Sequence, residues 1–122
     1  MQKGETFLMG NPGGRKKHLW IVIGDTPHPP GSGVAANVST DLCRTKGECP
    51  LTIGDHPWIT ENCAISFGDA LELNSGTELQ IQAGIRAGFI IIERPASPQL
   101  VLRIQTIANS TRSFPRTFLK YF

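Results

Sequence analysis

The fold of this chain is decided by residues 17–25, which read Lys-His-Leu-Trp-Ile-Val-Ile-Gly-Asp. Between positions 18 and 23 the stretch is rich in apolar, β-branched and aromatic side chains, which predicts a central β-strand. The glycine and aspartate that follow are turn residues and end the strand. On either side of this stretch, residues 4–9 and 34–40 predict two further strands, and the alternating residues 62–69 predict a half-buried one.

Glycines and prolines separate these strands and indicate the fold class. The 122 residues include 13 glycines and 9 prolines, which disfavours helical bundles and favours many short elements. Near the C-terminus, Ser97 and Pro98 supply a helix N-cap and a first helical residue. We expect one mainly-β domain over residues 1–122, a small curved antiparallel sheet or barrel with a C-terminal helical segment at about residues 97–122.

The segments between these elements give weaker signals. Residues 41–50 are expected to form a polar connection, followed by a short strand at residues 51–53. Residues 78–87 fit a helix or a strand equally, and residues 89–92 predict a strand by their composition.

Length and apolar content limit the class of protein. A chain of 122 residues fits one domain and excludes an enzyme with a separate cofactor-binding domain. The apolar runs, such as residues 89–92, are far shorter than the roughly 18–20 residues of a membrane span. No apolar signal segment follows Met1, and three cysteines are an odd number. We expect a reduced, cytoplasmic protein with no membrane partner.

Charge is distributed unevenly, although the formal net charge is only +2. Residues 15–18 read Arg-Lys-Lys-His, and residues 94–122 contain five basic side chains and no acid. The latter are Arg94, Arg103, Arg112, Arg116 and Lys120. Two basic zones on a small domain favour a polyanionic partner.

The cysteines raise the alternative of a zinc-stabilised domain. Cys43, Cys49, His56 and Cys63 are four candidate ligands, but the chain lacks the close Cys-x-x-Cys pair of most structural zinc sites. Cys63 also falls within a predicted strand, so a small core residue is the favoured interpretation. We therefore expect no metal and no other cofactor, because P-loop, dinucleotide-binding, nucleophile-elbow and zinc-protease motifs are also lacking.

The order of the first three strands resembles that of a known family. Residues 4–7 read Gly-Glu-Thr-Phe, residues 17–25 follow after a loop, and residues 36–40 read Ala-Asn-Val-Ser-Thr. This pattern resembles the PemK/MazF-like toxins of bacterial toxin–antitoxin systems. Residues 63–71 are similar to a later strand of that family, and the helix from Pro98 is similar in placement to its C-terminal helix.

The resemblance implies a fold, an activity and partners. The fold would be an SH3-like barrel of antiparallel strands with a C-terminal helix, assembled as a homodimer and bound by a cognate antitoxin protein. The activity would be endoribonuclease cleavage of single-stranded RNA without a metal. In this reaction the ribose 2′-hydroxyl attacks the neighbouring phosphate, so the protein must move protons and stabilise a charged phosphorane.

The resemblance also implies the site residues. Lys17 falls at the position of the family's arginine, which leads the second strand, and His18 stands where the family has proline. Ser39 falls on the hydroxyl position at the end of the third strand, beside Thr40. These four form the predicted catalytic set. The predicted substrate-binding residues are Arg15, Lys16, Trp58 and Arg103.

The departure from the family's arginine–proline pair leaves a second class of function open. Lysine offers a point charge in place of the bidentate guanidinium that matches phosphate geometry. The alternative is a non-catalytic SH3-like barrel that acts as a binding module for a protein or nucleic-acid partner. Basic, hydroxyl and imidazole side chains gathered in one groove would favour the enzyme, and their dispersal would favour the module.

Overall fold

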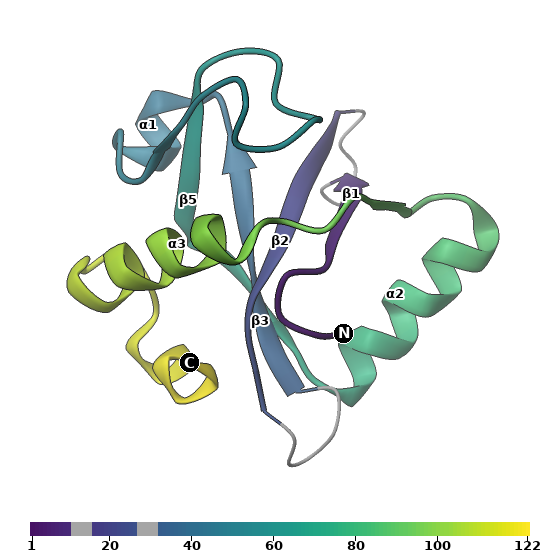
Figure 1. Cartoon of the computed structure of the whole chain (residues 1–122). Coiled ribbons are helices and arrows are strands. Elements are labelled where there is room, and N and C mark those ends of the chain that lie inside the picture. Colours follow the sequence, from purple (N-terminus) through teal and green to yellow (C-terminus); the bar gives the residue numbers. More distant parts are fainter. Residues whose placement is uncertain (11–15, 27–31) are drawn as a thin grey trace.

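Within the residues that the structure describes, six strands, three α-helices and one 3₁₀ helix follow one another. The computed structural model describes residues 1–10, 16–26 and 32–122, and Arg15 lies outside these ranges. The elements are β1 Thr6–Gly10, β2 Lys17–Thr26, β3 Ser32–Ser39, α1 Leu42–Thr45, β4 Pro50–Leu51, β5 Cys63–Leu73, α2 Ser75–Ala87, β6 Ile91–Glu93, α3 Pro98–Ser110 and the 3₁₀ helix η1 Arg116–Tyr121. The strands form one antiparallel sheet in the order β4-β5-β3-β2-β1-β6 (Figure 1).

Strand β2 is central and buried on both of its faces. Successive side chains of a strand point to opposite faces, so the apolar run divides between two clusters. Leu19, Ile21 and Ile23 join the cluster that α3 covers, while Trp20 and Val22 join the cluster that α2 covers. All five are at most 5% exposed, which confirms the predicted central strand and explains why its sequence is continuously apolar.

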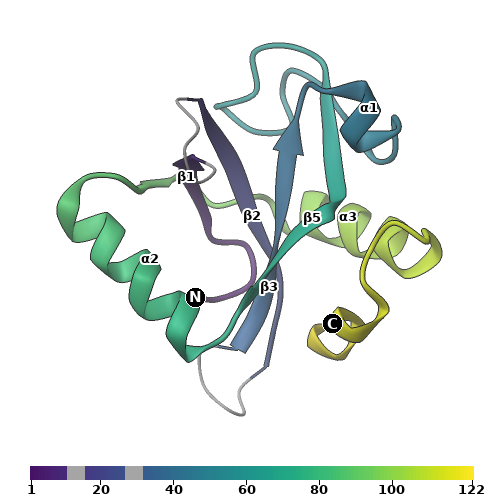
Figure 2. The same cartoon turned by 180° about the vertical axis from the view of Figure 1, so that it is seen from behind.

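The sheet is curled into a half-barrel with β4 and β6 at its edges. The β2–β3 pairing shifts register between Val22 and Gly24, and the β3–β5 pairing shifts between Ala35 and Asn37. Such bulges bend strands and increase their twist. The long strands β2, β3 and β5 curve together. Helix α3 lies across one face of the sheet, on the side where the C-terminus also lies (Figures 1 and 2). The predicted mainly-β, antiparallel and strongly curved architecture is therefore confirmed.

The helices agree with the sequence where a cap or an apolar stripe marks them. The Ser97 hydroxyl accepts the Leu100 N–H at 3.1 Å, which confirms the predicted start of α3. Residues 78–87, which fitted two interpretations, belong to helix α2, capped by Asn74. Residues 41–50 were expected to be a plain connection, but Asp41 caps the four-residue helix α1 there. None of the helices among the described residues is long and apolar enough to cross a membrane.

Two basic residues near the C-terminus are engaged in local structure. The Arg116 guanidinium donates hydrogen bonds to the carbonyls of Asn109 and Thr111, at 3.0 and 3.1 Å, and thus caps the end of α3. Lys120 lies 4.0 Å from a carboxylate oxygen of Glu72. Arg116 and Lys120 thus have partners within the protein, so these two residues of the basic C-terminal zone do not require a polyanionic ligand.

Gly24 permits the C-terminal segment to touch the sheet. A Cβ atom at this position would lie 2.6 Å from the Tyr121 carbonyl oxygen and 2.9 Å from the Phe122 ring. At Gly68 the nearest atom to an added Cβ would be the Ser113 carbonyl oxygen at 4.0 Å, which is an ordinary van der Waals contact.

We expect Gly24→Ala to lower the free energy of unfolding by about 1–3 kcal/mol, because the added methyl group overpacks the contact with residue 121. Gly68→Ala is the matched control, with an expected change within about 0.5 kcal/mol. Urea denaturation of both variants measures the difference. Equal stability of the two variants would contradict the described contact.

The Glu48 carboxylate, between α1 and β4, anchors the segment that follows α3. It accepts hydrogen bonds from the Ser113 hydroxyl at 2.6 Å and from the Thr111 hydroxyl. These hydrogen bonds favour the charged form and hold the pKa of Glu48 below its ordinary value. The stabilisation is therefore present above the unfolded-state pKa of about 4.3 and is lost as the pH falls through the lower folded-state pKa.

We expect Glu48→Gln to lower the free energy of unfolding at pH 7 by on the order of 1 kcal/mol, and to lower it less at pH 3. The reason is that the wild-type carboxylate loses its advantage once it is protonated. Denaturation curves from pH 7 to pH 3 check this, with Glu93→Gln as a variant of equal charge. If the difference in free energy of unfolding between wild type and Glu48→Gln is the same at pH 3 as at pH 7, the charged Glu48 carboxylate does not supply this stabilisation.

Candidate functional site

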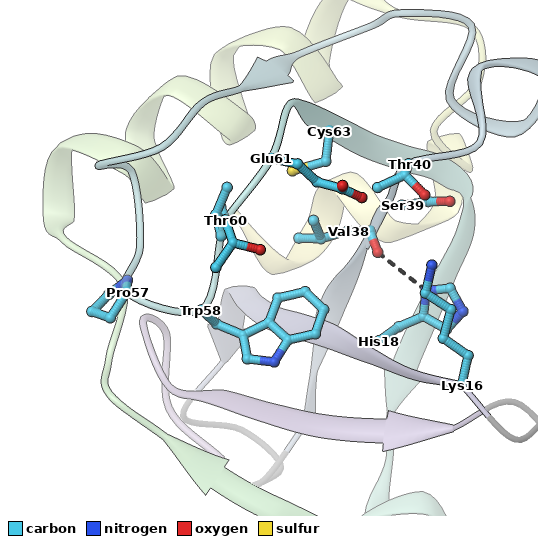
Figure 3. Close-up of a pocket in the computed structure, with 11 residues that line it drawn as sticks. Lys16, His18, Val38, Ser39, Thr40, Pro57, Trp58, Thr60, Glu61 and Cys63 are labelled. Atoms are coloured by element: carbon cyan, nitrogen blue, oxygen red, sulfur yellow. Dashed lines mark hydrogen bonds between the residues drawn. The ribbon is translucent and has the colours of Figure 1, made fainter.

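A pocket of about 520 Å³ opens at one end of the sheet, where β2 begins and β3 ends (Figure 3). One wall comes from these two strand ends and carries Lys16, His18, Ser39 and Thr40. The other wall comes from residues 57–61 and the start of β5. Because antiparallel neighbours place the start of one strand beside the end of the next, residues far apart in sequence meet at this rim.

The order of the strands brings His18 and Ser39 to the same pocket. The pairing of β2 with β3 extends to Trp20 and Asn37, and His18 and Ser39 each lie two residues beyond this pair, near the start of β2 and at the end of β3. Both residues line the pocket.

A backbone carbonyl fixes the tautomer of His18. Its Nδ1 lies 3.2 Å from the Val38 carbonyl oxygen (Figure 3). Because a carbonyl only accepts hydrogen bonds, Nδ1 carries the proton of the neutral ring. Nε2 is then left with its lone pair, which suits it to accept a proton from a bound molecule.

The hydroxyls at the end of β3 differ in exposure. Ser39 is buried, and its oxygen accepts the Asp41 N–H at 3.1 Å. Its own hydroxyl hydrogen is not used in that bond and is available to donate. Thr40 is exposed and lines the pocket beside it.

Buried His56 anchors the opposite wall. Its Nε2 donates to the Arg94 carbonyl at 2.6 Å, and its Nδ1 accepts the Trp58 N–H at 3.1 Å. The Arg94 carbonyl also accepts the Thr6 hydroxyl at 2.7 Å. A carbonyl only accepts and an amide N–H only donates, so Nε2 is the donor and Nδ1 the acceptor of this ring. His56 thereby fixes the segment that carries the half-buried Trp58.

The structure brings together five of the eight predicted site residues. These are Lys16, His18, Ser39, Thr40 and Trp58. Lys17 does not line the pocket, because alternation along β2 points it to the opposite face from Lys16 and His18. Arg103 lies on α3 and pairs with Asp55 at 2.9 Å, away from this pocket. Arg15 lies outside the described residues.

Two further polar residues line the pocket, and the sequence did not single them out. Thr60 and Glu61 follow Trp58 along the second wall. No motif marks them, and the one local signal is that the tryptophan comes directly after the turn at residues 54–57. Their position depends on His56, which anchors this segment through its hydrogen bond to the Arg94 carbonyl, 38 residues further along the chain.

The four candidate zinc ligands differ in their burial and in their hydrogen-bond partners. Cys43 is exposed, Cys49 is buried and Cys63 is half-buried, and both ring nitrogens of His56 are hydrogen-bonded. Burial raises the pKa of the Cys49 thiol to about 11 and also raises the pKa of Cys63. In the parts of the chain that the structure describes, no three His, Cys, Asp or Glu side chains are grouped to hold a metal ion.

Comparison of the whole chain with models of protein families, with curated proteins and with solved structures finds no match in any of the three. The pocket itself therefore offers the chemistry from which a function can be inferred. An imidazole with an open nitrogen, an ammonium group and two hydroxyls face an indole and a carboxylate across it.

We expect His56→Ala to lower the free energy of unfolding by about 3 kcal/mol, because it removes two hydrogen bonds and leaves a cavity where the buried ring lay. His18→Ala should cost about 1 kcal/mol or less, since it removes a single hydrogen bond at the rim. Urea denaturation followed by circular dichroism compares the two. Equal losses would mean that His56 does not hold the Trp58 wall.

Proposed function

We propose that this protein is a metal-independent endoribonuclease that cleaves single-stranded RNA by attack of the ribose 2′-hydroxyl. The observation that carries the proposal is the convergence of Lys16, His18, Ser39 and Thr40 in one pocket with Trp58. Gathering of basic, hydroxyl and imidazole side chains is what such an enzyme needs, and a binding module does not require it.

His18 supplies the general base of the reaction. With Nδ1 held by the Val38 carbonyl, Nε2 takes the proton of the 2′-hydroxyl, whose oxygen forms a bond to the adjacent phosphorus. The bond from phosphorus to the 5′ oxygen breaks, and that oxygen takes a proton from the Lys16 ammonium. Water then takes the proton from His18 and returns one to Lys16, which restores both groups. The products are a 2′,3′-cyclic phosphate and a 5′-hydroxyl.

The remaining residues of the pocket position the strand and stabilise charge. The Lys16 ammonium and the hydroxyls of Ser39 and Thr40 donate to the phosphate oxygens, where charge accumulates in the transition state. Trp58 offers an aromatic face to a base, as proteins that bind single-stranded RNA commonly do. Lys16, and not Lys17, takes the cationic role, because it shares the pocket with His18.

The proposal includes the finer fold and the cellular setting that the resemblance implies. The fold is an SH3-like barrel of the PemK/MazF kind, for which the curled antiparallel sheet and the helix α3 are the supporting features. The protein acts in the cytoplasm as a homodimeric toxin and is held inactive by a cognate antitoxin.

Incubation of the purified protein with single-stranded RNA in the presence of EDTA tests the activity. We expect cleavage with 2′,3′-cyclic phosphate ends, and none when the attacking ribose is replaced by deoxyribose. His18→Ala and Lys16→Ala should each reduce the rate by about 100-fold or more, because each removes a proton-transfer or charge-stabilising group. Lys17→Ala is the matched control and should cleave at nearly the wild-type rate.

RNA that stays uncut by the folded wild-type protein, with and without divalent metal, would overturn the proposal. Equal effects of Lys16→Ala and Lys17→Ala would instead remove this pocket as the site while leaving the activity. Inducible expression in bacteria gives an independent readout, since growth arrest that His18→Ala relieves is the outcome expected of an RNA-cleaving toxin.

A further inference from the structure

The two walls of the pocket differ in chemistry. The wall from β2 and β3 carries the ammonium, imidazole and hydroxyl groups that suit a phosphate and ribose. The wall from residues 57–61 carries the Trp58 indole, the Thr60 hydroxyl and the Glu61 carboxylate. The indole and the carboxylate both extend into the space between the walls (Figure 3). A carboxylate repels phosphate, so Glu61 suits a different part of a nucleotide.

Glu61 is exposed and free to meet a ligand. Among the described residues it forms no ion pair, and its side chain is not buried against the core. An ionised carboxylate only accepts hydrogen bonds, and its two oxygens match two adjacent donors. The ligand group it selects must therefore present N–H groups side by side.

Among the four RNA bases, guanine alone presents two adjacent donors on its Watson–Crick edge, at N1 and at the 2-amino group. Adenine, cytosine and uracil each place an acceptor next to the donor on that edge, which a carboxylate repels. Recognition of an unstacked base on this edge, while its face stacks on an aromatic ring, is the usual way that proteins bind single-stranded RNA.

The size of the pocket fits one nucleotide better than a longer segment. Its volume of about 520 Å³ lies within the range of sites that bury one small ligand, about 300–1,000 Å³. His56 fixes the backbone of Trp58 before any ligand arrives, so the aromatic platform is held in place by the fold. A nucleotide whose base stacks on Trp58 and whose phosphate contacts Lys16 would touch both walls of the pocket.

We propose that Trp58 and Glu61 form a guanine-selective base subsite, which gives the enzyme its sequence preference. The inference rests on the proposed function in one respect, that the bound polymer is single-stranded RNA. It adds a property that RNA cleavage does not require, namely that the Glu61 carboxylate chooses the base.

Binding of short 2′-deoxy oligonucleotides, which cannot be cleaved, tests the subsite without any need for activity. The probe is quenching of tryptophan fluorescence, which reports on Trp58 because the only other tryptophan, Trp20, is 5% exposed. We expect the oligonucleotide with one guanine to bind at least 10-fold more tightly than those with adenine, cytosine or thymine in its place. Hypoxanthine, which lacks the 2-amino group, should lose much of this advantage.

Glu61→Gln is the decisive variant, because an amide offers one donor and one acceptor in place of two acceptors. The guanine preference should fall by about 10-fold or more, while binding of the other oligonucleotides is kept or strengthened. Glu93→Gln makes the same change of charge away from this pocket and should leave the preference intact. Trp58→Phe should remove the quenching signal and thereby confirm its source.

The outcomes separate this inference from the proposed function. RNA cleavage without preference for guanine, or a guanine preference that survives Glu61→Gln, overturns the subsite and leaves the nuclease standing. Guanine-selective binding that Glu61→Gln abolishes, by a protein that leaves RNA uncut, supports the subsite and overturns the nuclease. Cleavage adjacent to guanine that becomes indifferent to the base in Glu61→Gln supports both.

Discussion

The burial of β2 on both faces is the constraint on which the rest of the structure depends. A strand whose side chains are apolar on each side must be covered twice, and the chain meets this demand with α3 on one face and α2 on the other. The cover by α3 is extended by the C-terminal segment, which reaches Gly24 because that position has no side chain. Helices α2 and α3 bury their apolar side chains against β2, and β2 is shielded from water only when both helices are in place.

The same constraint makes the candidate site rigid. The buried part of β2 ends at Leu19, so His18 and Lys16 project from the end of a strand that cannot shift without disturbing both clusters. The facing wall is a loop, but His56 ties it to the Arg94 carbonyl, which Thr6 of β1 also holds. Both walls are thus fixed to the sheet, and groups meant to contact one ligand keep their spacing before it binds.

The parts of the fold that depend on residues close together in sequence could be predicted from the sequence. The apolar run of β2 and the Ser97 cap follow from composition and capping. His18 and Ser39, which both line the pocket, were indicated by the family resemblance. Helix α2 was ambiguous because Ile81 is its single fully buried side chain, which leaves little amphipathic signal. Glu61 was missed because its position depends on a contact between His56 and Arg94, 38 residues apart.

The order of strands also determines how the chain must fold. After β5, the chain passes through α2 to the far edge of the sheet, where β6 pairs with β1. The Thr6 hydroxyl meets the Arg94 carbonyl across 88 residues of sequence, so the first strand stays without its outer neighbour until most of the chain is present. Topologies dominated by such distant pairings fold slowly, on the order of milliseconds to seconds. Until β6 is in place, the outer edge of β1 has unpaired backbone groups, and such an edge can pair with other chains.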